Sequence, residues 1–101
     1  LLGIRLLDGT ASVVPNIVSE KDSTETTLAT GITMADDTAV KFGMAWDGDA
    51  TITCYANNAT VGTITSNICD NQSLTPSIEM LTKHGSANSI YVDYILVRQE
   101  R

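Results

Sequence analysis

The chain has 101 residues, of which 43% are hydrophobic and 18% charged, and a formal net charge of −6. This length is enough for one compact domain and too short for two, and the apolar content excludes the composition of a disordered segment. The negative charge repels phosphate backbones and anionic lipid headgroups, so neither nucleic-acid nor membrane-surface binding is expected. Valine, isoleucine and threonine together supply 30 of the 101 residues. Because β-branched side chains fit a pleated sheet better than a helix, the composition favours an all-β domain.

The start of the chain gives no targeting signal. Residues 1–5 lack the basic region of a signal peptide, and no apolar run approaches the roughly 20 residues that span a bilayer. The chain does not begin with methionine, which predicts that it is processed or is part of a longer product.

Strand patterns recur about every 8–12 residues, which is typical of a sandwich or barrel. The first predicted strand spans Gly3–Leu7. The second spans Ser12–Ser19, and Pro15 within it predicts an edge position or a bulge, because proline cannot donate to the hydrogen-bond ladder. The polar window Ser19–Thr27 is predicted to be an exposed loop. A third strand is predicted over Glu25–Met34.

The strongest local pattern is a three-stranded meander over Ala39–Thr65. Apolar residues alternate with polar or small ones along its first strand, and Asp47–Gly48 then predicts a two-residue type I′ turn. Asp49–Asn57 is expected to return antiparallel to the first strand. A second tight turn at Asn57–Asn58 leads into the strand Ala59–Thr65.

The C-terminal part contains two further segments. Pro76–Gly85 fits a strand, with a helix capped by Thr75 as the alternative. Ser89–Arg98 is predicted to be a terminal strand. Both of its faces are largely apolar, which indicates a central strand covered on both sides.

The two cysteines predict no metal or redox site. Cys54 is expected to be a buried free thiol on the same strand face as Ile52 and Ala56, and Cys69 to lie in a loop. A disulfide between them would need an oxidising compartment. They lack CxxC spacing and His84 is distant in sequence, so no zinc site and no cofactor are expected.

Candidate catalytic groups are sparse. Glu20, Asp22 and Glu25 have a spacing that resembles the active-site strand of laminarinase-type glycoside hydrolases. The intervening residues are polar, however, where that family has apolar anchors, which favours a solvated loop. His84 has no nucleophile in a recognisable motif and is expected to be an exposed loop residue. Two aspartate pairs, Asp36–Asp37 and Asp47 with Asp49, are expected to form turns rather than a calcium site. The chain is therefore expected not to be an enzyme.

A glycan-binding site is the alternative to a purely structural role. Of the five aromatic residues, only Trp46 stands beside a turn and could serve as a stacking platform; the others are expected to pack in the core. The residues expected to form such a site are Trp46, Asp47, Asp49, Asn57 and Asn58.

The C-terminal half, residues 40–101, resembles the end of a concanavalin-like jelly roll of bacteriophage virion proteins. The resemblance rests on four segments: KFGMAWDG at Lys41–Gly48, TCYANNATVG at Thr53–Gly62, LTP at Leu74–Pro76 and SIYVDYILVRQ at Ser89–Gln99. The one departure is Ala59, where the family's hairpin has glycine after the asparagine. These motifs are structural, so the resemblance informs the fold more than the activity.

The resemblance implies a single β-sandwich domain over residues 1–101, with antiparallel strands in jelly-roll topology. Such a jelly roll has more strands than this chain shows, so the chain is expected to be the C-terminal part of a larger sandwich. The implied function is that of a capsid decoration or cement protein on the virion surface. Its expected partners are the major capsid protein or other virion proteins, and it is expected to form a homo-oligomer. The alternative is a carbohydrate-binding module of a phage fibre or secreted protein, and the third is a glycoside hydrolase fragment.

Overall fold

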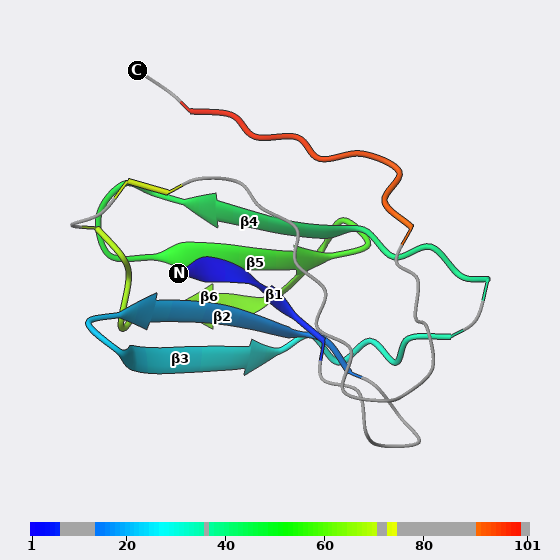
Figure 1. Cartoon of the computed structure of the whole chain (residues 1–101), viewed down its shortest axis with the longest axis horizontal. Helices are drawn as coiled ribbons and strands as arrows, with labels where there is room; N and C mark the ends of the chain where they lie inside the picture. Colours follow the sequence, from blue (N-terminus) through cyan, green and yellow to red (C-terminus); the bar gives the residue numbers. More distant parts are fainter. Residues whose placement is uncertain (7–13, 36, 71–72, 75–90, 100–101) are drawn as a thin grey trace, which may run out of the picture.

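The computed structural model describes residues 1–6, 14–35, 37–70, 73–74 and 91–99. Within these ranges the chain forms two antiparallel three-stranded sheets (Figure 1). The first sheet consists, in chain order, of β1 (Leu2–Arg5), β2 (Asn16–Lys21) and β3 (Thr24–Ala29). The second consists, again in chain order, of β4 (Phe42–Trp46), β5 (Ile52–Ala56) and β6 (Ala59–Ile64). The described part of the chain is therefore all-β, as its composition predicts.

β2 and β3 form a tight hairpin around Asp22 and Ser23, whose φ angles of +50° and +64° are those of a type I′ turn. On either side of the turn Glu20 pairs with Glu25 in the antiparallel register. The prediction of an exposed loop over Ser19–Thr27 is therefore wrong. Asp22 and Ser23 adopt positive φ angles without a glycine, and the polar side chains belong to strand positions.

Pro15 lies directly before β2 and not within it. β2 begins at Asn16 and is the central strand of its sheet, between β1 and β3. The Pro15 carbonyl accepts hydrogen bonds from the Thr30 amide at 3.0 Å and the Thr30 hydroxyl at 2.8 Å. The prediction of an edge or bulged strand over Ser12–Ser19 is wrong, because a proline outside the ladder removes no ladder donor.

The first and third strands are shorter than predicted. β1 ends at Arg5, and Leu7 lies outside the described residues. β3 ends at Ala29 and not at Met34, since Gly31 with φ +72° turns the chain shortly afterwards.

The second sheet confirms the predicted meander. Ile52, Cys54 and Ala56 are buried on one face of β5, whereas Thr53 and Tyr55 on the other face are partly exposed. Asn57 and Asn58 join β5 to β6 with φ angles of +49° and +65°, as the predicted tight turn requires.

The connection between β4 and β5 is wider than the predicted two-residue turn at Asp47–Gly48. Gly48 has a positive φ of +83°, but the chain returns only after Thr51. The Asp47 amide donates to the Thr51 carbonyl at 3.0 Å. The Asp47 carboxylate in turn accepts from the amides of Asp49 at 2.9 Å and Thr51 at 3.1 Å. The two-residue prediction is wrong because this side chain stabilises a longer loop.

The two sheets share one apolar core. Buried side chains from both sheets and from the segment after β6 form it, namely Ile17, Ile52, Cys54, Ile64 and Ile68. Leu2, Leu28, Met44 and Val61 pack around them. Cys54 is buried as predicted, and Cys69 in its loop is buried as well; both are free thiols.

A polar network joins the segment after β6 to the first sheet. The buried Ser19 hydroxyl donates to the Asn67 carbonyl at 2.7 Å. The Asn67 side-chain amide donates to the Thr26 hydroxyl at 2.8 Å, and Thr26 shares a 2.9 Å hydrogen bond with the Ser66 hydroxyl. Ser19 and Thr26 are cross-strand partners on β2 and β3, so the network fixes this segment against one sheet face.

The Lys21 ammonium and the Asp70 carboxylate form an ion pair at 2.6 Å beside this network. The hydrogen bond from Lys21 lowers the pKa of Asp70 below its ordinary value of 3.8. The hydrogen bond to Asp70 raises the pKa of Lys21 above its ordinary value of 10.5. The stabilisation is therefore complete between these two ordinary values. It is lost as the pH falls through the lowered pKa of Asp70 or rises through the raised pKa of Lys21.

We expect Asp70→Asn to lower the urea midpoint of unfolding slightly at neutral pH. The substitution removes the ion pair with Lys21, in which both side chains are charged at that pH, and an exposed pair contributes little. The difference from the wild type should shrink as the pH falls below 3.8, the ordinary pKa of the Asp70 carboxyl. Urea titrations across that pH range measure this. Asp49→Asn is the matched control on another exposed carboxylate. A difference that is constant across this range would contradict the ion-pair assignment.

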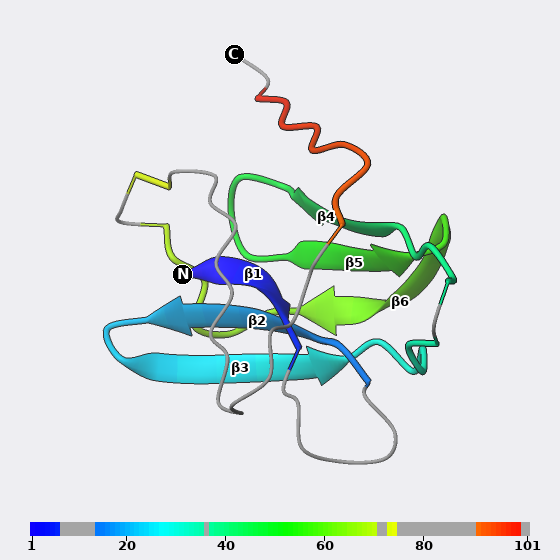
Figure 2. The same cartoon turned by 45° about the vertical axis from the view of Figure 1, so that its right-hand side comes forward.

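The C-terminal segment, residues 91–99, differs most from prediction. It is not part of a strand, and all nine of its residues are exposed. Its coil lies on the β4 side of the second sheet in both views (Figures 1 and 2). The prediction of a central strand covered on both sides over Ser89–Arg98 is therefore wrong for the described residues 91–98. The apolar pattern indicates that both faces of this segment would need to be buried, but it does not indicate whether a neighbouring strand is present to bury them.

The predicted segment Pro76–Gly85 lies outside the described residues. In the part of the chain that is described, no helix has the length and apolar character needed to cross a membrane.

Candidate functional site

The five residues predicted for a glycan site lie at opposite ends of β5. Trp46 pairs with Ile52 at one end of the β4–β5 ladder, whereas Phe42 pairs with Ala56 at the other. Trp46, Asp47 and Asp49 therefore belong to the β4–β5 loop, and Asn57 and Asn58 to the β5–β6 turn. The structure does not bring the two groups together.

At the loop end, Trp46 is partly exposed and anchored. Its side chain is 41% exposed, and its indole Nε1 donates to the Asp49 carbonyl at 3.3 Å. Hydrogen bonds from the amides of Asp49 and then Thr51 lower the pKa of the Asp47 carboxyl. Asp47 thus remains ionised at neutral pH, and its Oδ1 atom is occupied by the loop's own amides.

At the β5–β6 turn, Asn57 forms hydrogen bonds to the backbone of Lys41. Its Oδ1 accepts from the Lys41 amide at 3.1 Å, and its own amide donates to the Lys41 carbonyl at 2.7 Å. These bonds hold the start of β4 against the β5–β6 turn. Asn58 is left beside a surface hollow.

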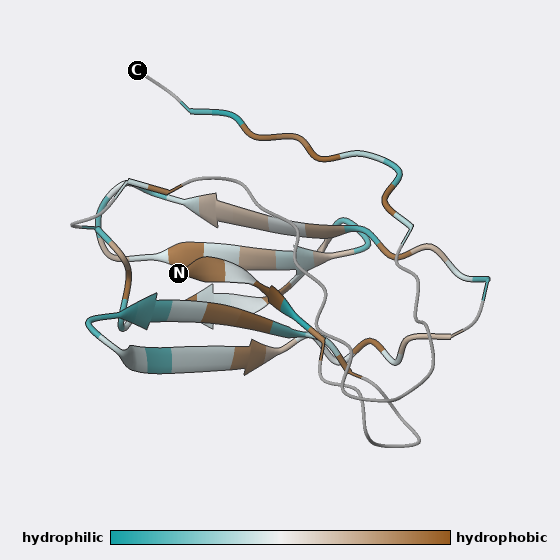
Figure 3. Ribbon diagram, in the orientation of Figure 1, coloured by the Kyte–Doolittle hydropathy of each residue, from teal (hydrophilic) through white to brown (hydrophobic). Residues whose placement is uncertain are grey.

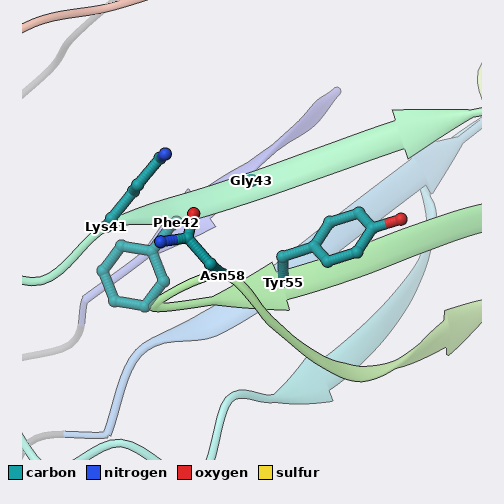
Figure 4. A pocket seen from close by; sticks show the side chains of 5 residues that line it. All are labelled: Lys41, Phe42, Gly43, Tyr55 and Asn58. Atoms are coloured by element: carbon teal, nitrogen blue, oxygen red, sulfur yellow. The ribbon is translucent and has the colours of Figure 1, made fainter.

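The hollow beside Asn58 has a volume of about 310 Å³ and is lined by Lys41, Phe42, Gly43, Tyr55 and Asn58. Figure 4 shows the Phe42 ring and the Asn58 amide near the turn, with Tyr55 farther along β5 and Lys41 extending from the start of β4. Its size is at the lower end of the range for small-molecule sites. Two aromatic rings, an ammonium and an amide are groups that could contact a sugar.

The sequence predicts core positions for Phe42 and Tyr55, whereas in the structure both line this hollow, which was not predicted. Gly43 pairs with Tyr55, and a Cβ atom at Gly43 would lie 3.7 Å from the Tyr55 Cβ and Cδ2 atoms. The tyrosine therefore covers the glycine on the outer face of the sheet. The pairing of an aromatic residue with a glycine on the next strand could have indicated the hollow. Recognising that pair requires the strand register, which the sequence alone did not provide.

A second hollow, of about 450 Å³, lies at the other end of β4. It is lined by Trp46, Ser73, Leu74, Val97 and Gln99. The exposed indole of Trp46 thus faces the C-terminal segment and not the predicted partner residues at the β5–β6 turn.

The acidic residues of the hydrolase alternative are partly brought together. Glu20 and Glu25 are cross-strand partners, whereas Asp22 lies in the turn. Glu25 is held by Arg5, whose Nη1 lies 2.8 Å from Oε1 and 2.7 Å from Oε2. The Glu20 carbonyl accepts from the N-terminal ammonium of Leu1 at 3.1 Å. Ion pairing to Arg5 of β1, on the far side of β2, is a structural role for Glu25.

Among the described residues, no group of three or more histidine, cysteine, aspartate or glutamate side chains is placed to hold a metal ion. Asp37 is exposed with a φ of +54°, whereas Asp36 and His84 lie outside the described ranges. In comparisons with known proteins, no family model, no curated protein and no solved structure matches this chain.

Proposed function

We propose that this protein is a non-enzymatic structural component of a virus particle, a decoration protein bound to the major capsid shell. The observation that carries the proposal is the exposed apolar segment 91–97, in which Tyr91, Tyr94, Ile95, Leu96 and Val97 are all more than half exposed. Exposed apolar surface of this extent is typical of a protein–protein association site. The same segment is part of the resemblance to phage virion domains.

The jelly-roll topology belongs to this proposal. The six described strands form two successive meanders, each within one sheet. A jelly roll would add strands to both sheets, and the unpaired segment 91–99 is one candidate. We propose that the remaining strands belong to a larger sandwich of which this chain forms a part.

The mechanism is association alone. A specific contact buries on the order of 1,000 Å² or more. Repeated over a symmetric shell, many such contacts add avidity and oppose the internal pressure of packaged DNA. The net charge of −6 keeps the protein from competing for that DNA.

Co-sedimentation with empty shells of the major capsid protein tests the proposal. We expect saturable binding at a fixed ratio of this chain to the shell protein, insensitive to added DNA. Bovine serum albumin, another acidic protein, is the control for non-specific trapping. Failure to pellet with the shells at any concentration would contradict the attachment.

A glycan-binding module is the second candidate, favoured by the hollow at Lys41, Phe42, Tyr55 and Asn58. On a glycan array, Tyr55→Ala should reduce the bound signal at least tenfold, since stacking on an aromatic ring orients a sugar. Thr53→Ala on the same face of β5 is the matched control, and circular dichroism checks folding. Trp46→Ala tests the site at the loop end. A signal that survives both aromatic substitutions, or no signal from the wild type, would exclude glycan binding at these sites.

A further inference from the structure

The C-terminal segment, residues 91–99, has the apolar pattern of a buried strand, but its side chains are exposed. Tyr91, Tyr94, Ile95, Leu96 and Val97 are 94%, 58%, 56%, 65% and 64% exposed. Figure 3 shows its apolar stretches lying apart from both sheets. Among the described residues it makes no backbone ladder. A strand with apolar side chains on both faces needs neighbours, and none of the six described strands pairs with this segment.

The edge of the second sheet at β4 lacks a neighbour in the same way. Among the described residues, β4 pairs with β5 and has no strand on its other side. Phe42, Met44 and Trp46 share a face with the fully buried side chains of β5, yet Phe42 and Met44 are only partly buried and Trp46 is 41% exposed. A further strand beside β4 would cover this face and satisfy its free backbone groups.

The charges that flank the two elements fit in one orientation. β4 is flanked by Lys41 and Asp47, positive then negative, whereas the segment contains Asp93 and Arg98, negative then positive. Parallel pairing places Asp93 beside Lys41 and Arg98 within one residue of Asp47. Antiparallel pairing places like charges together, which is destabilising.

The same parallel register fits the side chains. With Asp93 beside Lys41, Tyr94 and Leu96 lie next to Phe42 and Met44 on the core face. On the outer face, Ile95 and Val97 then lie beside the small residues Gly43 and Ala45 of β4. Large side chains thus meet small ones on one face and extend the core on the other.

We propose that residues 91–99 of one copy pair as a parallel strand with β4 of a second copy, and reciprocally, to form a closed dimer. Each copy carries both the donor segment and the acceptor edge at β4. One two-fold symmetric exchange therefore forms two equivalent contacts, in which each segment pairs with the β4 edge of the other copy. Among the described residues of one chain, Val97 and Gln99 share a hollow with Trp46 at the end of β4.

The size of the contact agrees with a stable dimer. Specific interfaces bury about 1,200–2,000 Å² in total, and two exchanged segments with the exposures above supply apolar area of that order. Each segment contributes one Asp and one Arg, so the contact is locally neutral although each copy has a charge of −6. The exchange buries the segment whose exposure also carries the proposed capsid attachment, so the two associations compete for it. The inference itself concerns the isolated protein and is tested without a shell.

Sedimentation velocity of the purified chain over a range of concentrations tests the inference without any shell present. We expect a monomer–dimer equilibrium. Asp93→Lys should raise the dimer dissociation constant at least tenfold, and adding Lys41→Asp to it should restore the constant to within about threefold, because opposite charges again face each other. Asp22→Lys, on an exposed turn of the other sheet, is the matched control. Circular dichroism of each variant checks folding, and Ile95→Asp is a second variant expected to dissociate the dimer.

Three outcomes would overturn the inference. A wild type that is monomeric at every concentration excludes the second copy, including the case in which the segment folds onto its own β4. A dimer strengthened by Asp93→Lys indicates antiparallel pairing. A dimer unaffected by both Asp93→Lys and Ile95→Asp forms through another surface.

Discussion

Replacing Ile17 with alanine is expected to lower the free energy of unfolding by about 2–5 kcal/mol, the usual cost of such a cavity in a packed core. Ile17 is fully buried on β2, and belongs to the cluster in which Ile52 and Ile64 of the second sheet also lie. The substitution thus removes contacts between the two sheets as well as within one. Equilibrium unfolding in urea at neutral pH measures the change.

Ile4→Ala on the neighbouring strand is the matched control, because Ile4 pairs with Ile17 but is 39% exposed. It should cost less than half as much as Ile17→Ala. Equal losses at the two positions would mean that Ile17 is no more buried than Ile4, and would contradict a core shared by both sheets.

The second large effect is expected at Gly62 of β6, where the two sheets approach closely. A Cβ atom there would lie 3.0 Å from the Leu28 Cδ2 atom and 3.2 Å from its Cδ1 atom. Gly62→Val adds two more methyl groups at this point. We expect it to destabilise the fold by about 1–3 kcal/mol, the usual cost of overpacking, and by the further strain of a side chain at the Gly62 φ of +156°.

A double-mutant cycle isolates that contact. In a Leu28→Ala background the added valine should cost at least about 0.5 kcal/mol less than in the wild type, because the clashing methyl groups are gone. Gly48→Val is the control, since Gly48 also has a positive φ, of +83°, and nothing lies within 4 Å of a Cβ atom there. If the effects of Gly62→Val and Leu28→Ala simply add, the two strands do not meet where the structure places them.

The sequence predicted those elements whose signals are local. Alternation along β5 identified the buried face of Ile52, Cys54 and Ala56, and the paired asparagines identified the β5–β6 turn. The β2–β3 hairpin was missed because Asp22 and Ser23 adopt turn angles that usually indicate glycine. The network that joins Ser19 to Asn67 could not be predicted, since it links residues 48 positions apart.

The candidate sites depend on register, which the sequence determines poorly. Trp46 and Asn57 both lie beside turns, but antiparallel pairing places those turns at opposite ends of β5. The hollow beside Tyr55 became visible only through the pairing of Tyr55 with Gly43. Likewise, the apolar pattern of residues 91–99 predicted a strand, but among the described residues the segment is exposed and pairs with no strand.

Quantitative mass spectrometry of purified particles from the source of this sequence tests the proposed role most directly. The account predicts that peptides of this chain occur in a fixed, high-copy ratio to the major capsid protein, and that the ratio persists through repeated gradient purification. Particles that lack the chain, or carry it at a ratio that falls with each purification step, would contradict a structural role in the virion.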